Sequence, residues 1–267
     1  MKMAWAFFKR DAAIAYSYRA AFLAHLIGNV VMLAMLYYVG KTVGPQSLPA
    51  LAKYGGNFLA FVLIGVALTD CVTVSLASFG AQVREAQTTG TLEATLMSPV
   101  RLSTILVCSS LWNYFLCAIR FSLYLAVGGS IFGISLGRAN LTSATVIFIL
   151  TVLCFMGIGI LWAGIVLLMK RGEALMGVGG MVLLMFGGVL FPTSTLPAWI
   201  QNLARLVPLN PALEGMRFAL LQGYGLKQLQ DIVISLSVFS VVLLGAGILG
   251  FNAAVQMGRK SGSLTQY

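Results

Sequence analysis

Long uninterrupted apolar runs constrain the fold of this chain more than any other feature. Six mostly hydrophobic stretches recur along it, separated by polar segments. They cover residues 20–40, 57–80, 104–135, 143–169, 174–191 and 231–252. A helix needs about 20 apolar residues to cross a bilayer, whereas a barrel strand shows about ten residues of alternating polarity. Because the runs here are continuous, they predict an all-α integral membrane protein with six transmembrane helices.

The composition agrees with this fold class. Of the 267 residues, 59% are hydrophobic and 9% are charged, whereas a soluble domain carries about 25% charged residues. Polar residues form only short segments between the apolar runs, and nothing suggests a separate soluble part. Residues 1–267 are therefore expected to form a single transmembrane domain.

The basic residues indicate the orientation of the helices. The net charge is +10, but no basic patch carries interleaved aromatic residues, so a nucleic-acid partner is not expected. With the N-terminus inside, ten basic residues lie in cytoplasmic segments: Lys2, Lys9, Arg10, Arg19, Arg84, Arg101, Lys170, Arg171, Arg259 and Lys260. Six lie outside, spread over more residues: Lys41, Lys53, Arg138, Arg205, Arg217 and Lys227. This excess predicts a multi-pass protein of the plasma (inner) membrane with both termini in the cytoplasm.

The N-terminal segment, residues 1–19, mixes basic residues with Trp, Phe and Tyr and lacks the apolar core of a signal peptide. Amphipathic helices of this composition lie in the interface between lipid headgroups and acyl chains. We therefore expect an interfacial helix in contact with membrane lipids.

The polar segment 81–103 lies between the second and third apolar runs. Glu85, Thr89 and Glu93 recur at four-residue spacing, and Leu92 lies on a neighbouring stripe. One short helix could therefore show a polar and an apolar face, ending at Ser98-Pro99, because proline removes a backbone donor. We interpret this helix as a surface that another protein grips.

A second informative segment, residues 192–230, follows the fifth run. Pro192 and Pro197 mark the start of a helix, Leu196, Trp199, Ile200 and Leu203 recur at helical spacing, and Pro208 and Pro211 break the helix before a second one. Both helices are too short to cross a bilayer. We expect them to dip into the outer leaflet and return, with Phe191, Trp199 and Leu203 as an apolar lid and Glu214 paired with Arg217 one turn away.

Three polar residues fall inside the apolar runs. Arg120 lies in the middle of the third run, with Asn113 on the same stretch, and Asp70 lies in the second run. An Arg at the bilayer centre costs roughly 2.5–3.5 kcal/mol, so it must face protein or water. Asp70 can pair with Arg120, and the pair either bridges two helices or lines a substrate pathway.

Small residues in the runs are interpreted as packing residues. The four cysteines, Cys71, Cys108, Cys117 and Cys154, show no metal-binding spacing. Gly129 with Gly133, and the glycines at 177–180, are candidates for close helix contact.

The chain offers little for catalysis. Gly40-Lys41-Thr42 ends like a phosphate-binding loop, but Met35 stands where the first glycine is needed. His25 is the single histidine, so neither a metal site nor a His-based nucleophile is expected. We predict a protein that is not an enzyme and binds no cofactor.

The order of these elements resembles the permease subunit of ATP-binding cassette exporters of the type-2 class. The Glu-x-x-x-x-Gly-Thr-Leu-Glu…Ser-Pro segment is similar to the coupling helix of that family, and the Phe-Pro…Leu-Pro-x-Trp…Pro-Leu-x-Pro…Arg segment is similar to its outer re-entrant segment. The resemblance covers nearly the whole chain. Lys170-Arg171-Gly172-Glu173 and Leu196-Pro197-x-Trp199 look most like the drug and nodulation-factor exporters.

The resemblance implies two copies of the permease with two ATPase subunits, ATP and Mg being bound by the ATPase. It assigns ATPase coupling to Glu85, Gly90, Thr91, Leu92, Glu93, Ser98 and Pro99. It assigns the outer gate to Phe191, Pro192, Pro197, Trp199, Leu203, Glu214 and Arg217. The expected activity is export of a lipophilic or amphipathic substrate, such as a drug, lipid or glycolipid, from the cytoplasm or the inner leaflet.

Two alternative functions stay open. One is export of a polysaccharide or lipid-linked glycan by a permease of the same class. The other is an ion-coupled carrier that acts without an ATPase and uses Asp70 or Arg120 as its coupling group. Such carriers often consist of two similar halves with broken helices, which this sequence does not show. An intramembrane enzyme would need a nucleophile and a base, and none is found.

Overall fold

The computed structural model describes most of the chain and consists of helices wherever it describes regular structure. The described residues are 2–17, 24, 27–28, 30–32, 34–35, 37–39, 41, 49–55, 57–90, 102–130, 133–134, 137–169, 179–180, 183 and 186–261. Within them, four helices are long and apolar enough to cross a membrane. These are α3 (Phe58–Thr88), α5 (Leu102–Ser130), α6 (Leu141–Met169) and α10 (Gln230–Ser261).

These four helices correspond to the second, third, fourth and sixth predicted crossings. The first and fifth predicted crossings, 20–40 and 174–191, lie largely outside the described residues, so the predicted count of six stays a prediction. Three predicted boundaries are wrong. The helix of the second crossing continues to Thr88 instead of ending at 80, and that of the sixth continues to Ser261 instead of ending at 252. The helix of the third crossing ends at Ser130 instead of 135. Gly133, at φ +66°, turns the chain there.

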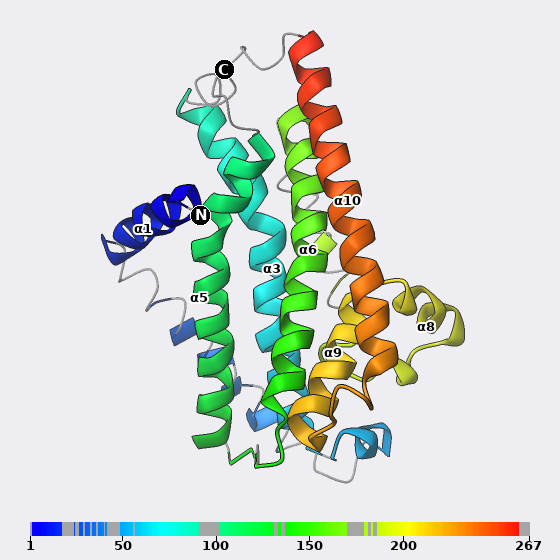
Figure 1. Ribbon diagram of the computed structural model, residues 1–267. Coiled ribbons are helices and arrows are strands. Elements are labelled where there is room, and N and C mark those ends of the chain that lie inside the picture. The colour runs from blue at the N-terminus through cyan, green and yellow to red at the C-terminus, as the bar shows by residue number, and fades with distance from the viewer. Residues whose placement is uncertain are drawn as a thin grey trace.

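The four long helices form a row in which each packs on the next: α5 on α3, α3 on α6, and α6 on α10 (Figure 1). The main apolar core lies where α3, α5, α6 and α10 meet the short helices between 198 and 222. Asn57 begins α3, because its side-chain oxygen accepts a hydrogen bond from the backbone N–H of Ala60 at 3.0 Å. Asn140 starts α6 in the same way through Ser143, at 3.1 Å. Both are typical N-caps.

Glycines allow α6 to approach both of its neighbours. A Cβ at Gly157 would overlap the backbone of Leu243, and one at Gly247 would overlap the carbonyl of Gly157, so α6 and α10 touch backbone to backbone. On α6, Gly159 lies against the carbonyl of Ser75 on α3. The glycines predicted for close helix contact are not the ones that make it. Gly129 has only ordinary contacts, and Gly179 and Gly180 have open space around them.

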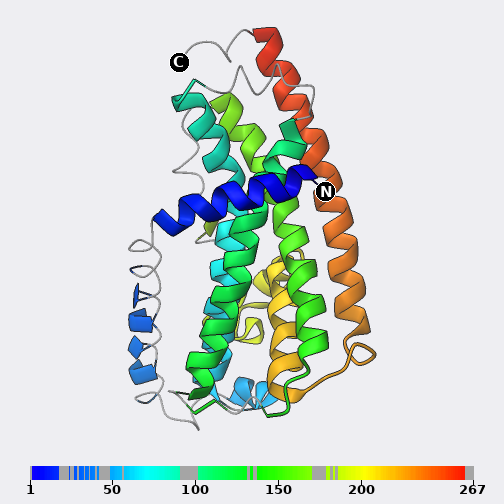
Figure 2. The same cartoon turned by 60° about the vertical axis from the view of Figure 1, so that its left-hand side comes forward.

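The N-terminal helix α1 (Lys2–Ser17) runs across the long helices instead of beside them (Figure 2). It packs on α5 through Phe8, whose ring meets the edges of Trp112 and Phe115 at centroid distances of 5.0 and 5.5 Å. Trp5 stacks on Phe8 and stays exposed. The structure thus shows a helix over the predicted N-terminal segment, and its position in the membrane interface stays a prediction.

The ends of the bundle differ in content. The C-terminal ends of α3, α6 and α10 lie together at one end (Figure 1). The opposite end holds η1 (Pro49–Tyr54) and the short helices of the C-terminal half of the chain. These are η2 (Thr193–Thr195), α8 (Ala198–Arg205), α9 (Leu209–Arg217) and the π-helical turn η3 (Phe218–Gln222). We refer to residues 188–217 as the re-entrant segment and to the end of the bundle that carries it as the re-entrant end.

Candidate functional site: two polar ends and an ion pair between them

The end of α3 opposite the re-entrant segment carries the start of the predicted coupling region. Glu85 is exposed, and its carbonyl accepts hydrogen bonds from the backbone N–H and the hydroxyl of Thr89 at 2.9 and 2.7 Å. Gly90 has φ +67°, a left-handed conformation that favours glycine and ends helices. The prediction that one helix contains both Glu85 and Glu93 is therefore wrong, because the backbone turns at Gly90.

The remaining predicted coupling residues lie outside the described residues. They are Thr91, Leu92, Glu93, Ser98 and Pro99. The structure shows where this segment is attached, namely at the C-terminal end of α3. Because α3 is continuous, this segment follows directly from a helix whose other end contacts the re-entrant segment.

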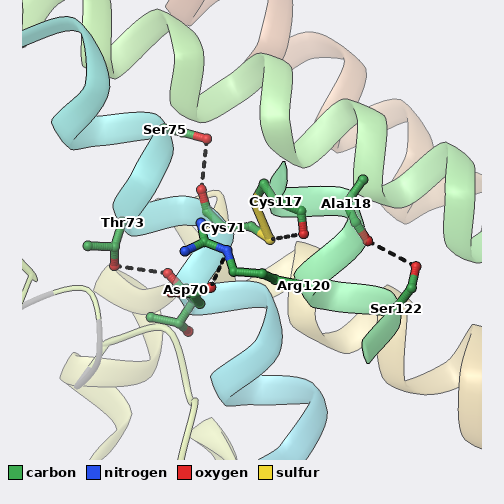
Figure 3. The surroundings of a disulfide bond; sticks show 9 residues. Asp70, Cys71, Thr73, Ser75, Cys117, Ala118, Arg120 and Ser122 are labelled. Carbon is green, nitrogen blue, oxygen red and sulfur yellow. Dashed lines mark hydrogen bonds and ion pairs between the residues drawn. A yellow bond between two sulfur atoms is a disulfide. The ribbon is translucent and has the colours of Figure 1, made fainter. Parts of the chain in front are cut away.

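Between the two ends, the structure brings Asp70 and Arg120 together. Nε of Arg120 lies 3.4 Å from Oδ2 of Asp70, and the two side chains are 12% and 15% exposed. Figure 3 shows the two side chains facing each other between α3 and α5. Asn113 is half-buried on α5, two turns before Arg120 and outside this contact. Opposite charges next to each other in a low-dielectric interior offset part of their desolvation cost.

A disulfide joins the same two helices beside the ion pair. Cys71 follows Asp70 on α3, Cys117 lies one turn before Arg120 on α5, and their Cα atoms are 5.4 Å apart (Figure 3). Both cysteines were interpreted as packing residues from the sequence, so this bond was not predicted. Without the relative placement of α3 and α5, no spacing along the chain could have identified the pair.

A further polar contact between α3 and α5 was not predicted. The side-chain amide of Gln82 donates to the hydroxyl of Ser110 at 3.1 Å, and Ser110 is fully buried. Gln82 lies near the polar end of α3, and Ser110 lies on α5 within the third predicted run. No sequence pattern marks either residue as a contact between helices. The two helices are therefore tied at three levels: the ion pair, the disulfide and this hydrogen bond.

At the re-entrant end, Pro197 precedes α8 as predicted. The amide of Gln201 donates to the carbonyls of Leu196 at 2.8 Å and Ser194 at 3.3 Å, which fixes the start of the helix. On its inner face Ile200 is buried, whereas Trp199 is 65% and Leu203 is 47% exposed. An apolar face that points away from the protein fits contact with lipid or with a substrate.

Residues 191 and 192 lead into this helix. Phe191 is half-buried and Pro192 is buried, so the chain is anchored before it reaches α8.

The break predicted at Pro208 and Pro211 differs in detail from the structure. Pro208 precedes α9, but Pro211 lies in its first turn, where the missing N–H has no intrahelical partner to lose.

The predicted pair between Glu214 and Arg217 is wrong. Glu214 forms its ion pair with Lys53 of η1, whose ammonium also lies 5.2 Å from the centre of the Phe218 ring. Burial alone would lower the pKa of Lys53, but the hydrogen bond and the charge of Glu214 raise it above its ordinary value. The pair therefore persists at neutral pH. The carboxylate of Glu214 is therefore paired with η1 instead of with Arg217.

Arg217 is buried instead of interfacial, with 3% of its surface exposed. Its Nε donates to the carbonyl of Phe61 at 3.3 Å, and its Nη2 donates to the carbonyls of Gly188 and Val189 at 3.0 Å each. Burial lowers the pKa of Arg217 to about 9, while the nearby Tyr54 and Glu214 raise it, so the guanidinium is charged at neutral pH. A buried charge was not foreseen, because its three acceptors are remote in sequence.

The described residues contain no group of three His, Cys, Asp or Glu side chains that could hold a metal ion. The site is therefore a set of mechanical and electrostatic contacts: a polar helix end, an ion pair within the bundle, and a re-entrant segment tied to α3.

The family comparison agrees with this arrangement. The family model described as ABC-2 type transporter matches residues 3–221, from α1 through the re-entrant segment to η3. A search of curated proteins finds no match to the chain. The family match covers far more than half of the 267 residues. The chain therefore belongs to the ABC-2 type transporter family, whose members are the membrane permeases of ATP-binding cassette transporters.

Proposed function

We propose that this chain is the transmembrane subunit of an ATP-driven exporter that moves a lipophilic or amphipathic substrate out of the cytoplasm or the inner leaflet. The observation that carries the proposal is the family match over residues 3–221 of a chain built from long apolar helices. The pairing of Asp70 with Arg120 is compatible with an apolar substrate, because the two opposite charges offset each other. A drug, a lipid or a glycolipid fits this description.

The proposed coupling site runs from Glu85, in the last turn of α3, to Pro99 beyond its end. Its start is polar and exposed, and it is attached to a helix that runs the length of the bundle. In this proposal two ATPase subunits bind ATP and Mg and grip the segment on two copies of the permease. Closure of the ATPases tilts α3 and its neighbours and opens the pathway outward.

The orientation follows from the distribution of Lys and Arg. The end with the C-termini of α3 and α10 is proposed to be cytoplasmic, with α1 in the cytoplasmic interface, and the re-entrant end is proposed to face outward. This places the exposed Trp199 and Leu203 at the exit, where they act as an apolar lid. A closed lid prevents a wet channel from leaking ions.

Two alternatives predict different results. Export of a polysaccharide or lipid-linked glycan keeps the ATPase but requires a different substrate. An ion-coupled carrier requires Asp70 or Arg120 to change charge or partner during transport. In the structure the two side chains instead pair with each other across α3 and α5.

The test is purification of the tagged chain from its natural membrane, followed by an ATPase assay. We expect a separate ATPase to co-purify and Glu93→Arg to reduce its binding or its stimulation by the permease, while the permease stays folded. The matched control is Asp231→Arg, which makes the same charge change at the exposed start of α10, at the opposite end. Transport without any ATPase would favour the carrier, and normal ATPase coupling in Glu93→Arg would contradict the proposed coupling site.

A further inference from the structure

Arg217 has an unusual environment for a charged side chain. It ends α9, it is almost completely buried, and it donates to carbonyl oxygens on two other parts of the chain. One is Phe61, in the first turn of α3, and the other is the turn formed by Gly188 and Val189. Its guanidinium carbon also lies 3.3 Å from the centre of the Phe61 ring. One side chain therefore holds together three segments that are far apart in sequence.

This arrangement is costly if its purpose is stability alone. Burying a charge requires several kcal/mol of compensation, and apolar side chains of similar volume often hold segments together at least as well. The hydrogen-bond acceptors of Arg217 are neutral carbonyls, so no carboxylate accepts its bonds directly. What guanidinium offers is a rigid, planar set of donors with fixed directions. It defines one relative position for the three segments and penalises others.

The surface of α3 is shaped to receive this contact. Gly65 lies one turn after Phe61, and a Cβ there would lie 2.5 Å from the carbonyl oxygen of Val189 and 3.0 Å from Nη2 of Arg217. Only glycine leaves room for both groups. Gly188 adopts φ +69°, which turns its carbonyl and that of Val189 toward Arg217. The contact is thus built from both sides.

The helix that Arg217 holds is also the one that carries the proposed coupling segment. α3 has 31 residues without a break, which corresponds to a length of about 46 Å. Its first turn is tied to the re-entrant segment, and its last turn carries Glu85. A continuous helix attached at both ends can transmit displacement from one end to the other.

We infer that Arg217 is a positioning residue that joins the re-entrant segment to the outer end of α3, so that the two move as one body when the ATPases act on the other end of α3. This inference rests on the proposed function. The pair of Lys53 and Glu214 lies nearby but is more exposed, with 57% of the Lys53 side chain accessible. We call the contact of Arg217 with α3 and the re-entrant segment the joint. The pair of Lys53 and Glu214 is its control, because it lies at the same end of the molecule and is not part of the joint.

The experiment uses the complete transporter with its ATPase in lipid nanodiscs. A cysteine replaces Asn202, which is exposed on α8, and its modification by a membrane-impermeant maleimide is timed with and without trapped ATP. In the otherwise unchanged protein, we expect trapped ATP to change the labelling rate. In Arg217→Lys and in Gly65→Ala, ATP hydrolysis should continue, the labelling response should be lost, and transport should fall by about tenfold. Lys53→Gln should retain both.

Each result has one meaning. A normal labelling response in Arg217→Lys contradicts the inference about Arg217 and does not affect the proposed function. If trapped ATP does not change the labelling rate in the otherwise unchanged protein, the re-entrant segment does not move, and the inference is also wrong. Failure of both variants to assemble makes Arg217 a folding residue and rejects the inference. If no ATPase associates with the unchanged protein, the proposed function is wrong, and the joint falls with it.

Discussion

At the scale of single residues, charges inside the bundle behave as their scarcity in the sequence predicts. Asp70 and Arg120 lie 3.4 Å apart, as expected for two opposite charges that must avoid lipid. Arg217 shows the limit of that reasoning. Its spacing from Glu214 suggested an exposed pair, but the acceptors of its hydrogen bonds are backbone carbonyls, which every residue has and no sequence pattern marks.

The ion pair leads to a prediction about stability. Removing one partner leaves a poorly compensated charge, so Asp70→Asn or Arg120→Gln alone should lower the free energy of unfolding by about 3 kcal/mol. The double variant should lose less than the sum of the two, because neither charge remains. Thermal unfolding of the purified protein in detergent measures this coupling.

The same variants separate the two roles that the pair can have. If Asp70 and Arg120 only bridge α3 and α5, the folded double variant should keep transport, and this is the result we expect. A folded double variant without transport would place the pair in the substrate pathway. Asp231→Asn, an exposed carboxyl at the start of α10, controls for the loss of a negative charge.

At the scale of elements, helix ends carry most of the functional information. α3 ends at Gly90 through a left-handed turn, and α8 starts after Pro197 with Gln201 bonded to the preceding carbonyls. Glycine and proline mark these ends in the sequence, because glycine tolerates the left-handed conformation and proline fixes φ and lacks a backbone N–H. The predicted second crossing is shorter than α3, because the polar residues after 80 were assigned to a separate short helix although they continue α3 to Thr88.

The exposed face of α8 leads to the second prediction. Trp199→Ala should reduce export by about tenfold or change the substrate range, since burial of one large apolar side chain contributes roughly 1.5–3 kcal/mol. Expression and assembly should stay near normal, because Trp199 is 65% exposed and the buried contacts of α8 are made by Ile200 and Ala204. Transport into inverted vesicles measures the effect.

A matched control is available on α1. Trp5 is 67% exposed, so Trp5→Ala removes the same side chain from a similar degree of exposure elsewhere in the molecule. It should leave export nearly unchanged. Normal transport in Trp199→Ala combined with poor folding would show that α8 is a scaffold and that the gate lies elsewhere.

At the scale of the whole molecule, the row of long helices separates two ends of different composition. The C-terminal ends of α3 and α10 lie at one end of the bundle, and α8 and α9 lie toward the other (Figure 1). The distribution of basic residues predicts that the first of these ends lies in the cytoplasm. The arrangement of the helices also places the proposed coupling segment and the proposed lid at opposite ends of α3.

The third prediction concerns this orientation. Cysteines at Thr89 and Lys260, both exposed, should react with an impermeant reagent only when the cytoplasmic side is accessible, and a cysteine at Asn202 only from outside. Gln87 is unsuitable for labelling, because the structure buries it. Labelling of Thr89 from outside would invert the topology and remove the basis for coupling at that end.

The sequence alone determined the class of the protein, the order of its main elements and the residues at which several of them begin or end. Apolar runs, prolines and capping residues act over a few neighbouring positions, so a linear reading can find them. The tertiary structure decided which residues meet. Arg217 and Phe61 lie 156 positions apart, and Gly157 meets Gly247 only because α6 and α10 cross there. Contacts of this kind depend on how whole helices pack, and hydrophobicity drives that packing without specifying its partners.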